Sequence, residues 1–263
     1  MTAERGTALV RRPGPRLADG LVTHLDRTPV DLDLALDQHG RYVAALAANG
    51  WRVAEVAPAD DCPDAVFVED TVVVVDDLAV LTRPGAPARR PEVPGVREAV
   101  AAQGLRSVEL ADPATLDGGD VLQVGRTVYV GRGGRTNGEG IRQLRAAVAP
   151  LGRAVVAVQL KSVLHLKSAV TALPDGTLLA LPDLLDAGPL PGWRVPPEEP
   201  GAHVVPLGGG RVLLAASAPL TAEWLLDLGF DVVRVDVGEF EKLEGCVTCL
   251  SVLIPAAGTN PSG

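Results

Sequence analysis

Aromatic residues are scarce in this chain, at 3% of its 263 residues, so an apolar core has to be built mainly from valine, leucine and alanine. Apolar residues nevertheless make up 47% and charged residues 22%, the balance of a globular protein with a sizeable core. No apolar run approaches the roughly 20 residues of a membrane span, and residues 1–12 lack the apolar segment of a signal peptide. We therefore expect a cytoplasmic protein without a membrane partner.

Cysteine and positive charge are also in short supply. Three cysteines, an odd number, argue against a disulfide framework and suit a reducing compartment. The net charge is −9, from 24 Lys and Arg against 33 Asp and Glu, which argues against nucleic acid as a partner and tolerates a cationic ligand. No dinucleotide fingerprint follows a predicted strand, and the glycine-rich stretch 131–134 lacks the P-loop lysine. We expect no cofactor.

What the chain does contain is a repeating pattern. Pairs of short β-branched runs around tight turns predict four hairpins, which span residues 66–82, 121–130, 169–181 and 203–216. Helical periodicity that stops at glycine or proline predicts helices over residues 34–49, 96–103, 140–148 and 221–228. A short strand follows each helix, at residues 52–56, 106–110, 154–158 and 231–235. A fifth unit is completed by pairing strand 8–11 with strand 250–254.

The repeat predicts an α/β fold in which five ββαβ units form a five-bladed propeller around a central channel, with residues 1–263 as a single domain. The alternative is a doubly wound parallel sheet, which needs single strands between helices rather than hairpins. A closed ring also hides strand edges. The Pro- and Gly-rich stretch 183–202 predicts a surface loop that shortens or displaces the helix of one unit.

Cys249 directly precedes a predicted strand and invites three interpretations: nucleophile, redox pair with Cys246, or metal ligand. A single C-x-x-C is an incomplete structural zinc site, and a thioredoxin-type pair would open a helix. Polar clusters at residues 64–70, 117–120 and 164–168 add carboxylates and His165, although each alone is also explained by a turn, a strand edge or a structural histidine. Together they supply the groups of an activated cysteine nucleophile.

These clusters, in this order, resemble the dimethylarginine dimethylaminohydrolases of the pentein, or guanidine-modifying, superfamily. The fold of that family is a five-unit α/β propeller, in agreement with the repeat count. The resemblance spans nearly the whole chain and rests on the segments 63–70 (PDAVFVED), 81–90 (LTRPGAPARR), 115–121 (TLDGGDV), 135–137 (RTN), 164–168 (LHLKS) and 248–254 (TCLSVLI).

By this resemblance, Cys249 is the nucleophile, His165 the general acid and base, and Asp117 the carboxylate that orients the histidine. The resemblance also assigns substrate contacts. They are Glu69 and Asp70 for the guanidinium, Arg89 and Arg135 for the α-carboxylate, Asp64 and the Leu243 carbonyl for the α-amino group, and Val22 for an N-terminal loop that closes over the substrate. The resemblance is poorest in that loop, and no role follows for Cys62 or Cys246.

The resemblance implies hydrolysis of a small-molecule substrate, Nω-methylated arginine, to citrulline and dimethylamine or methylamine through a thiouronium intermediate on cysteine. No metal is required. Arginine deiminase and amidinotransferase activities use similar residues on the same fold, although deiminases carry an extra helical insert for which this chain has no spare segment. A non-catalytic propeller that binds a protein surface is the alternative from another class. A homodimer is compatible with the sequence, and the preferred guanidine is left open.

Overall fold

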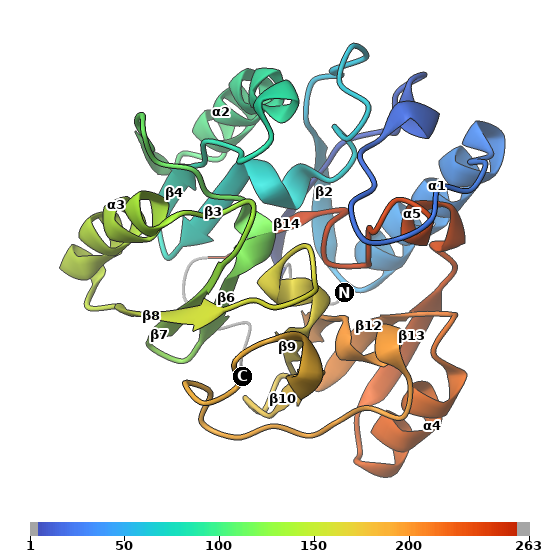
Figure 1. The fold of residues 1–263 in the computed structure, drawn as a ribbon. Helices are drawn as coiled ribbons and strands as arrows, with labels where there is room; N and C mark the ends of the chain where they lie inside the picture. The colour runs from blue at the N-terminus through green and yellow to red at the C-terminus, as the bar shows by residue number, and fades with distance from the viewer. Residues whose placement is uncertain (1–4, 257–263) are drawn as a thin grey trace.

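The computed structural model describes residues 5–256, which form five small sheets arranged around a centre (Figure 1). The first strand of each three-stranded sheet is antiparallel to the middle strand, and the middle strand is parallel to the outer one. From the inner strand outward, the sheets are β14 (Val252–Pro255), β1 (Gly6–Val10) and β2 (Trp51–Glu55); β3 (Val72–Val75), β4 (Leu78–Leu81) and β5 (Arg106–Glu109); β6 (Val121–Val124), β7 (Thr127–Arg132) and β8 (Ala154–Gln159); β9 (Val170–Ala172) and β10 (Leu178–Ala180); and β11 (Val204–Gly208), β12 (Arg211–Ala215) and β13 (Asp231–Val235). The predicted five-bladed propeller is confirmed.

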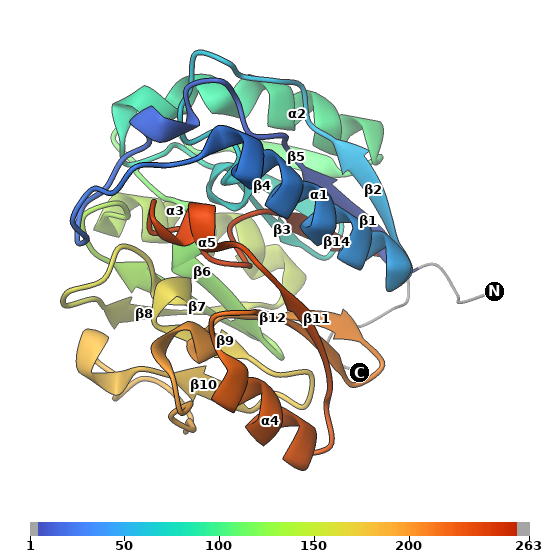
Figure 2. The same cartoon turned by 90° about the vertical axis from the view of Figure 1, so that its right-hand side faces the viewer.

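Four helices lie on the outside of the ring, where Figures 1 and 2 show them. They are α1 (Leu32–Ala48), α2 (Val93–Ala102), α3 (Gly138–Val148) and α4 (Pro219–Asp227). Each connects a middle strand to the outer strand parallel to it, because parallel neighbours need a crossover. Local sequence sets their ends: the Asp31 and Asn137 side chains cap the N-termini of α1 and α3, and Gly50 follows α1 with a φ of 87°. A short helix, α5 (Gly238–Glu241), was not predicted.

The fourth blade in chain order is reduced to two strands. After β10 the chain passes through two 3-10 turns, Pro182–Leu184 and Glu199–Ala202, and touches the sheet through one parallel bridge between Leu179 and Arg194. The predicted loop over residues 183–202 is therefore confirmed. Its prolines cannot supply the N–H groups of a helix interior, so no crossover helix forms in this blade.

A tight turn precedes each inner strand at the same position of every blade. It is a 3-10 turn at Val68–Thr71, Gly118–Asp120, Leu166–Ser168 and Glu199–Ala202, and a turn closed by the Cys249 N–H on the Cys246 carbonyl in the blade of β14. Two predicted strands consequently begin later than expected, at Val72 instead of residue 66 and at Val252 instead of residue 250. The local cause is visible at Glu69, whose N–H bonds to the Cys249 carbonyl rather than to a strand partner.

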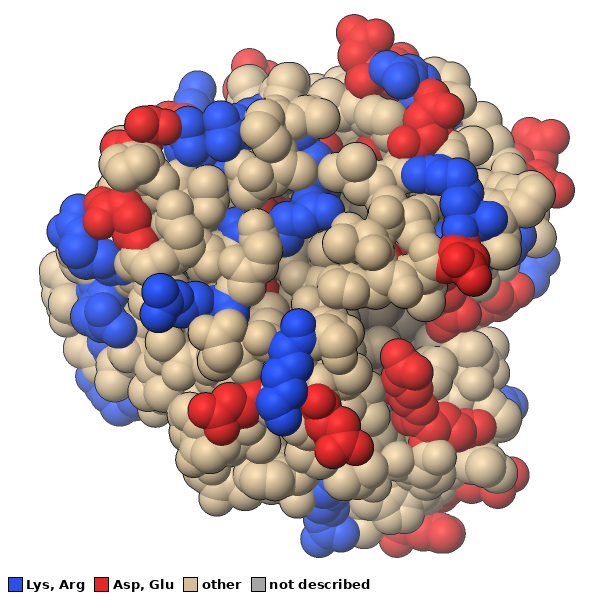
Figure 3. Space-filling view, viewed as in Figure 1, with Lys and Arg blue, Asp and Glu red and all other residues tan. Residues whose placement is uncertain are grey.

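The core follows from the composition: Val, Leu and Ala of neighbouring blades pack together in buried clusters. Full burial of one such side chain contributes about 1.5–3 kcal/mol, so many modest contributions replace a few aromatic ones. The first and last described strands, β1 and β14, pair with each other and thereby join the two ends of the ring. None of the described helices has the length and apolarity to cross a membrane. Figure 3 shows basic and acidic side chains interspersed around a hollow near the middle of one face.

Candidate active site

A small cavity of about 20 Å³ near the centre of the ring brings together most of the predicted site residues. Its lining comprises Leu21, Asp64, Phe67, Asp70, Arg89, Arg135, Leu164, His165, Leu243, Glu244, Gly245 and Cys249. The sulfur of Cys249 and the imidazole of His165 thus share one cavity, although they come from different blades. Such a volume holds about one water molecule. An arginine-sized ligand therefore requires part of this lining to move.

The His165 ring is held by Asp117, which lies behind it and is fully buried. His165 Nε2 is 2.9 Å from Asp117 Oδ2, while Oδ1 of the same carboxylate accepts the Gly85 N–H at 2.8 Å. With Nε2 engaged, Nδ1 is the nitrogen left for a substrate, and it lies 3.8 Å from Asp70 Oδ1. Asp117 thus contacts the histidine from behind without lining the cavity itself, and its role in orienting the ring stays a prediction.

Charge around the His165 ring favours its protonated form. Burial opposes the charge, but the carboxylates of Asp70, Asp117 and Asp120 outweigh burial and raise the pKa of His165 to about 9. Burial also raises the pKa of Asp120 to about 7, although His165 and the Thr136 hydroxyl, 2.5 Å from Asp120 Oδ2, act in the opposite direction. His165 therefore carries a proton near neutral pH.

Asp70 is an anion at the edge of the same cavity. Its Oδ2 is 2.5 Å from Arg89 Nη1, and its Oδ1 accepts the Gly119 N–H at 2.9 Å. Burial opposes ionisation, but His165 and Arg89 together lower the pKa of Asp70 to about 2. Arg89 is 4% exposed and also binds Glu92 and the carbonyls of Asp64 and Phe67. Its contact with a substrate carboxylate stays a prediction.

The double glycine before Asp120 is required by the approach of two side chains. A Cβ on Gly119 would lie 2.7 Å from Asp70 Oδ1 and 2.8 Å from His165 Nδ1. A Cβ on Gly118 would lie 2.0 Å from the Glu69 carbonyl oxygen. The segment 117–120 is therefore more than a flexible turn, because the absence of both side chains lets Asp70 and His165 meet over it.

Cys249 is paired with Cys246. The two Sγ atoms are 3.4 Å apart, and the Cys246 N–H points to Cys249 Sγ at 3.4 Å. Donation of the Cys249 S–H to Cys246, burial and the nearby Glu69 and Asp70 carboxylates raise the pKa of the Cys249 thiol, while the same hydrogen bond lowers the pKa of Cys246. These interactions favour the neutral thiol of Cys249. All three cysteines of the chain are free.

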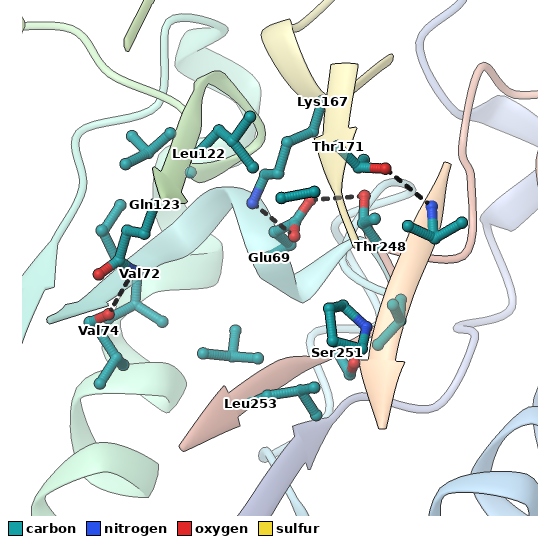
Figure 4. Close-up of a pocket in the computed structure, with 18 of the residues that line it drawn as sticks. Glu69, Val72, Val74, Leu122, Gln123, Lys167, Thr171, Thr248, Ser251 and Leu253 are labelled. Carbon is teal, nitrogen blue, oxygen red and sulfur yellow. Dashed lines mark hydrogen bonds and ion pairs between the residues drawn. The ribbon is translucent and has the colours of Figure 1, made fainter. Parts of the chain in front are cut away.

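Glu69 does not line the cavity with Cys249. Its carboxylate binds Lys167 Nζ at 2.6 Å and the Thr248 hydroxyl at 3.1 Å, and it faces a second, larger cavity on the other side of the turns (Figure 4). Its predicted guanidinium contact stays a prediction. In the N-terminal loop, Leu21 lines the catalytic cavity, whereas Val22 packs against the core cluster beneath it.

This N-terminal loop is held over the cavity by acidic side chains. The Leu21 N–H bonds to Asp64 Oδ1 at 3.0 Å, and Arg135 Nη2 lies 3.5 Å from the Thr23 hydroxyl. Glu244 accepts the N–H groups of residues 23, 24 and 25. Glu244 itself has a φ of 60°, a left-handed conformation that is costly for a residue other than glycine. Its carboxylate fastens the loop beside Leu243.

Asp70, Asp117 and His165 offer three possible metal-ligand atoms within 4.8 Å of one another. The donor set is already committed, because His165 binds Asp117 directly and the Arg89 guanidinium occupies Asp70. Arg89 would also repel a metal cation at short range. The arrangement fits an oriented acid–base histidine better than a metal centre, and the expectation of a metal-free site stays a prediction.

Comparison with known proteins identifies relatives of the chain. No family model matches the chain. The chain is 64% identical over 246 residues to the N(G),N(G)-dimethylarginine dimethylaminohydrolase of Streptomyces coelicolor, covering 93% of this chain and 95% of that protein. It is 35% identical over 249 residues to the protein of the same name from Pseudomonas aeruginosa, covering 93% and 97%. A solved structure of that enzyme, a Cys-to-Ser mutant complexed with citrulline, covers 95% of this chain and 100% of that one, with a TM-score of 0.88 and 32% identity.

Five blades whose inner turns bring a cysteine, an acid–base histidine and carboxylates into one cavity define the pentein class of guanidine-modifying α/β propellers. Within that class, the sequence relatives decide the family. The chain belongs to the dimethylarginine dimethylaminohydrolases.

Several residues that shape the site were assigned no individual role from the sequence. They are Asp120, which accepts the Leu166 N–H at 2.9 Å beside His165, Lys167 and Thr248, which bind Glu69, and Glu244, which holds the loop. Three of them, Asp120, Lys167 and Thr248, lie inside the segments that carry the family resemblance. The sequence did not reveal which residues they bind. Glu244 lies outside those segments, and its left-handed backbone leaves no trace in the residue type.

Proposed function

We propose that the chain hydrolyses Nω-methylated arginine to citrulline and dimethylamine or methylamine, with Cys249 as the nucleophile. The observation that carries the proposal is the shared cavity of Cys249, His165 and Asp70, in a chain 64% identical to a protein named for this activity. The P. aeruginosa relative was solved in complex with citrulline, the product expected here. The same geometry favours an enzyme over a non-catalytic propeller, because a binding protein has no need of a polarised histidine beside a thiol.

The substrate cation is bound by carboxylate. Asp70 stays ionised at neutral pH because Arg89 and His165 stabilise its charge, and it faces the cavity that holds Cys249. A guanidinium on Asp70 forms charge-assisted hydrogen bonds that fix its plane. A sulfur above that plane can then reach the central carbon. The positive charge of the bound substrate lowers the pKa of the Cys249 thiol and so favours the thiolate.

The first half-reaction forms a carbon–sulfur bond and breaks a carbon–nitrogen bond. The Cys249 thiolate attacks the guanidinium carbon and gives a tetrahedral adduct. The amine leaves only when protonated, and His165, protonated at neutral pH, donates that proton from Nδ1. A thiouronium remains on the sulfur, and His165 is now neutral.

The second half-reaction is hydrolysis. Neutral His165 takes a proton from a water molecule that attacks the same carbon, and collapse of the adduct releases citrulline and the Cys249 sulfur. Asp117 keeps the ring in one orientation through both steps, since its bond to Nε2 does not depend on the substrate. One histidine therefore serves as acid and then as base. None of these steps needs a metal or an organic cofactor.

The amino-acid end of the substrate is proposed to bind at the opposite wall. Arg135, with 14% of its side chain exposed, is the guanidinium of this wall with the fewest protein partners, and it is our candidate for the α-carboxylate, with Arg89 behind it. Asp64 and the Leu243 carbonyl are candidates for the α-amino group. The loop of Leu21 and Val22 would close over both. Because the cavity measures about 20 Å³, binding requires this loop to open.

Citrulline formation from asymmetric dimethylarginine, monomethylarginine and arginine, measured side by side, tests the proposal. We expect turnover of the methylated substrates and none by Cys249→Ser, whose fold is checked by circular dichroism. Faster turnover of arginine would make the chain a deiminase, and transfer of the amidino group to an added amine would make it an amidinotransferase. Guanidines without an α-carboxylate, such as agmatine analogues, should react poorly if Arg135 binds that group.

We also propose that residues 1–263 act as one domain, which the pairing of β1 with β14 supports. A cytoplasmic location is proposed on the basis of three free cysteines. The homodimer stays a prediction, for which light scattering after size-exclusion chromatography is the direct measurement.

A further inference from the structure

The proposed reaction begins with a proton that has to leave Cys249. The thiol is neutral in the unliganded site, and the attacking species is the thiolate. His165 is the obvious base, but it already carries the proton that the leaving amine will take. Asp70 is a poor base because Arg89 and His165 hold it as an anion. Neither His165 nor Asp70 is therefore available to accept the thiol proton of Cys249.

A continuous chain of hydrogen-bonding groups leads away from Cys249 on the other side. Cys249 Sγ lies 3.4 Å from Cys246 Sγ, and Cys246 Sγ lies 3.2 Å from the Thr248 hydroxyl. The Thr248 hydroxyl donates to Glu69 Oε2 at 3.1 Å, and Glu69 Oε1 is 2.6 Å from Lys167 Nζ. Each link is a group that can release one proton while it receives another. Because the Thr248 hydroxyl gives its proton to Glu69, its oxygen is free to accept the S–H of Cys246.

The chain ends at a second cavity, drawn in Figure 4. This cavity has a volume of about 230 Å³ and is lined by residues from the inner strands of all five blades, so it occupies the central channel of the propeller. Glu69, Lys167 and Thr248 line it, whereas Cys249 and His165 do not. Its volume is ample for several water molecules that could carry a proton onward.

We propose that Cys246, Thr248 and Glu69 form a proton path that takes the thiol proton of Cys249 to the channel cavity when the cationic substrate binds. The inference rests on the proposed function and adds two residues, Cys246 and Thr248, that the family resemblance leaves without a role. Glu69 is the acceptor at the end of the path.

The protons balance along this path. The Cys249 S–H proton passes to Cys246, the Cys246 proton passes to the Thr248 oxygen, and the Thr248 proton passes to Glu69. Cys249 ends as a thiolate and Glu69 as a carboxylic acid, while Cys246 and Thr248 are unchanged. When citrulline leaves and the sulfur takes up a proton, the same path runs in reverse or Glu69 exchanges its proton with the channel.

Glu69 is suited to this role. Burial raises its pKa to about 7, even though Lys167 opposes the shift, so protonated and ionised forms are close in energy at neutral pH. The charged or titratable groups that face it are Lys167, Asp70, Tyr42 and the two cysteines Cys246 and Cys249. Lys167 stabilises the ionised carboxylate of Glu69, which is the form that accepts a proton. Protonation breaks this ion pair, but it also removes a buried negative charge, and the second effect offsets the first.

Thr248→Val removes the hydroxyl link while keeping the shape of the side chain, and Thr248→Ser restores the link. The measurement is the single-turnover rate of covalent intermediate formation with a methylated arginine, as a function of pH, in water and in deuterium oxide. In Thr248→Val we expect a rate at pH 7 at least about 10-fold below wild type, in line with the 10²–10⁴-fold contribution of proton transfer in general. The residual rate should rise with pH as hydroxide takes over, and the solvent isotope effect should change. Thr248→Ser should recover the wild-type pH dependence and isotope effect.

Cys246→Ala breaks a different link of the path and should give the same pH-dependent loss of rate. The proposal can therefore still be tested if Thr248→Val folds poorly. A uniform loss at every pH, with an unchanged isotope effect, would show a merely structural role and overturn the path. Wild type that forms no intermediate with any methylated arginine would instead refute the proposed function. Alkylation of Cys249 by iodoacetamide, located by mass spectrometry, reports thiolate formation in both cases and keeps the two failures distinct.

Discussion

Replacing Asp117 by asparagine removes one negative charge beside His165 while keeping the size of the side chain. Asp117 Oδ1 accepts the Gly85 N–H, so the amide oxygen of the variant has to take that position. The amide N–H₂ then faces His165 Nε2, which must become an acceptor. The ring is thereby pushed toward its neutral form, with the proton on Nδ1.

The size of the effect follows from the distance of 2.9 Å between Asp117 Oδ2 and His165 Nε2. Unit charges about 4 Å apart interact by about 4 kcal/mol at an effective dielectric constant of about 20. Since about 1.4 kcal/mol corresponds to one pKa unit, the loss of this charge should lower the pKa of His165 from about 9 by about 3 units. The protonated acid needed for amine departure would then be lost between about pH 5 and pH 7 instead of near pH 9.

The assay is the pH profile of kcat for citrulline release. In wild type, kcat should fall as pH rises through the pKa of His165, and in Asp117→Asn the same fall should begin at lower pH. Saturating substrate is essential because Arg135 Nη1 is 4.0 Å from the same carboxylate, so binding can weaken independently. Asp117→Glu keeps the charge and is the matched control. Alkaline limbs of Asp117→Asn and wild type that coincide would refute the assignment of Asp117 as the source of the raised pKa.

Three further predictions concern neighbouring groups. In Gly119→Ala the new Cβ would lie 2.8 Å from His165 Nδ1, so kcat should fall about 100-fold in a protein that still folds, and normal activity would disprove the close approach. Arg89→Met strands the buried Glu92 charge and should lower the free energy of unfolding by about 3–5 kcal/mol in urea titrations; a loss below about 1 kcal/mol would contradict the ion-pair network. Glu244→Gly keeps the left-handed backbone but removes the acceptor of three N–H groups, so KM should rise about 10-fold while stability stays within about 1 kcal/mol; an unchanged KM would count against the loop as a lid.

The propeller was predictable because the residues that end its helices act locally. Gly50 after α1 adopts a φ of 87° and Gly104 after α2 one of 75°, so the breakers that ended the helical pattern do so for a steric reason. The turns before the inner strands were not predictable. Residues 66–68, Val-Phe-Val, are apolar like the strand that follows, and hydrophobic pattern alone does not separate a buried 3-10 turn from a buried strand.

Membership in the site was predictable, but the direction of some side chains was not. Cys249, His165 and Asp70 do line one cavity, as their order in the resemblance implied. Glu69 and Asp70 were both expected to contact the guanidinium, yet the two adjacent carboxylates of the 3-10 turn line different cavities. The direction of a side chain in such a turn depends on its hydrogen-bond partners. Those partners come from other blades, so the local sequence does not predict the direction.

The ring of turns is therefore best understood as a partition between two cavities. In each of two turns, consecutive residues face opposite ways: Glu69 and Thr248 line the channel cavity, while Asp70 and Cys249 line the catalytic one. Five blades that place equivalent turns around one axis make this partition only a side chain thick. Such a wall separates the two cavities, and the hydrogen-bonded side chains within it connect the Cys249 sulfur to the channel cavity. The same repeat that hides the strand edges thus places the nucleophile one residue away from a second cavity.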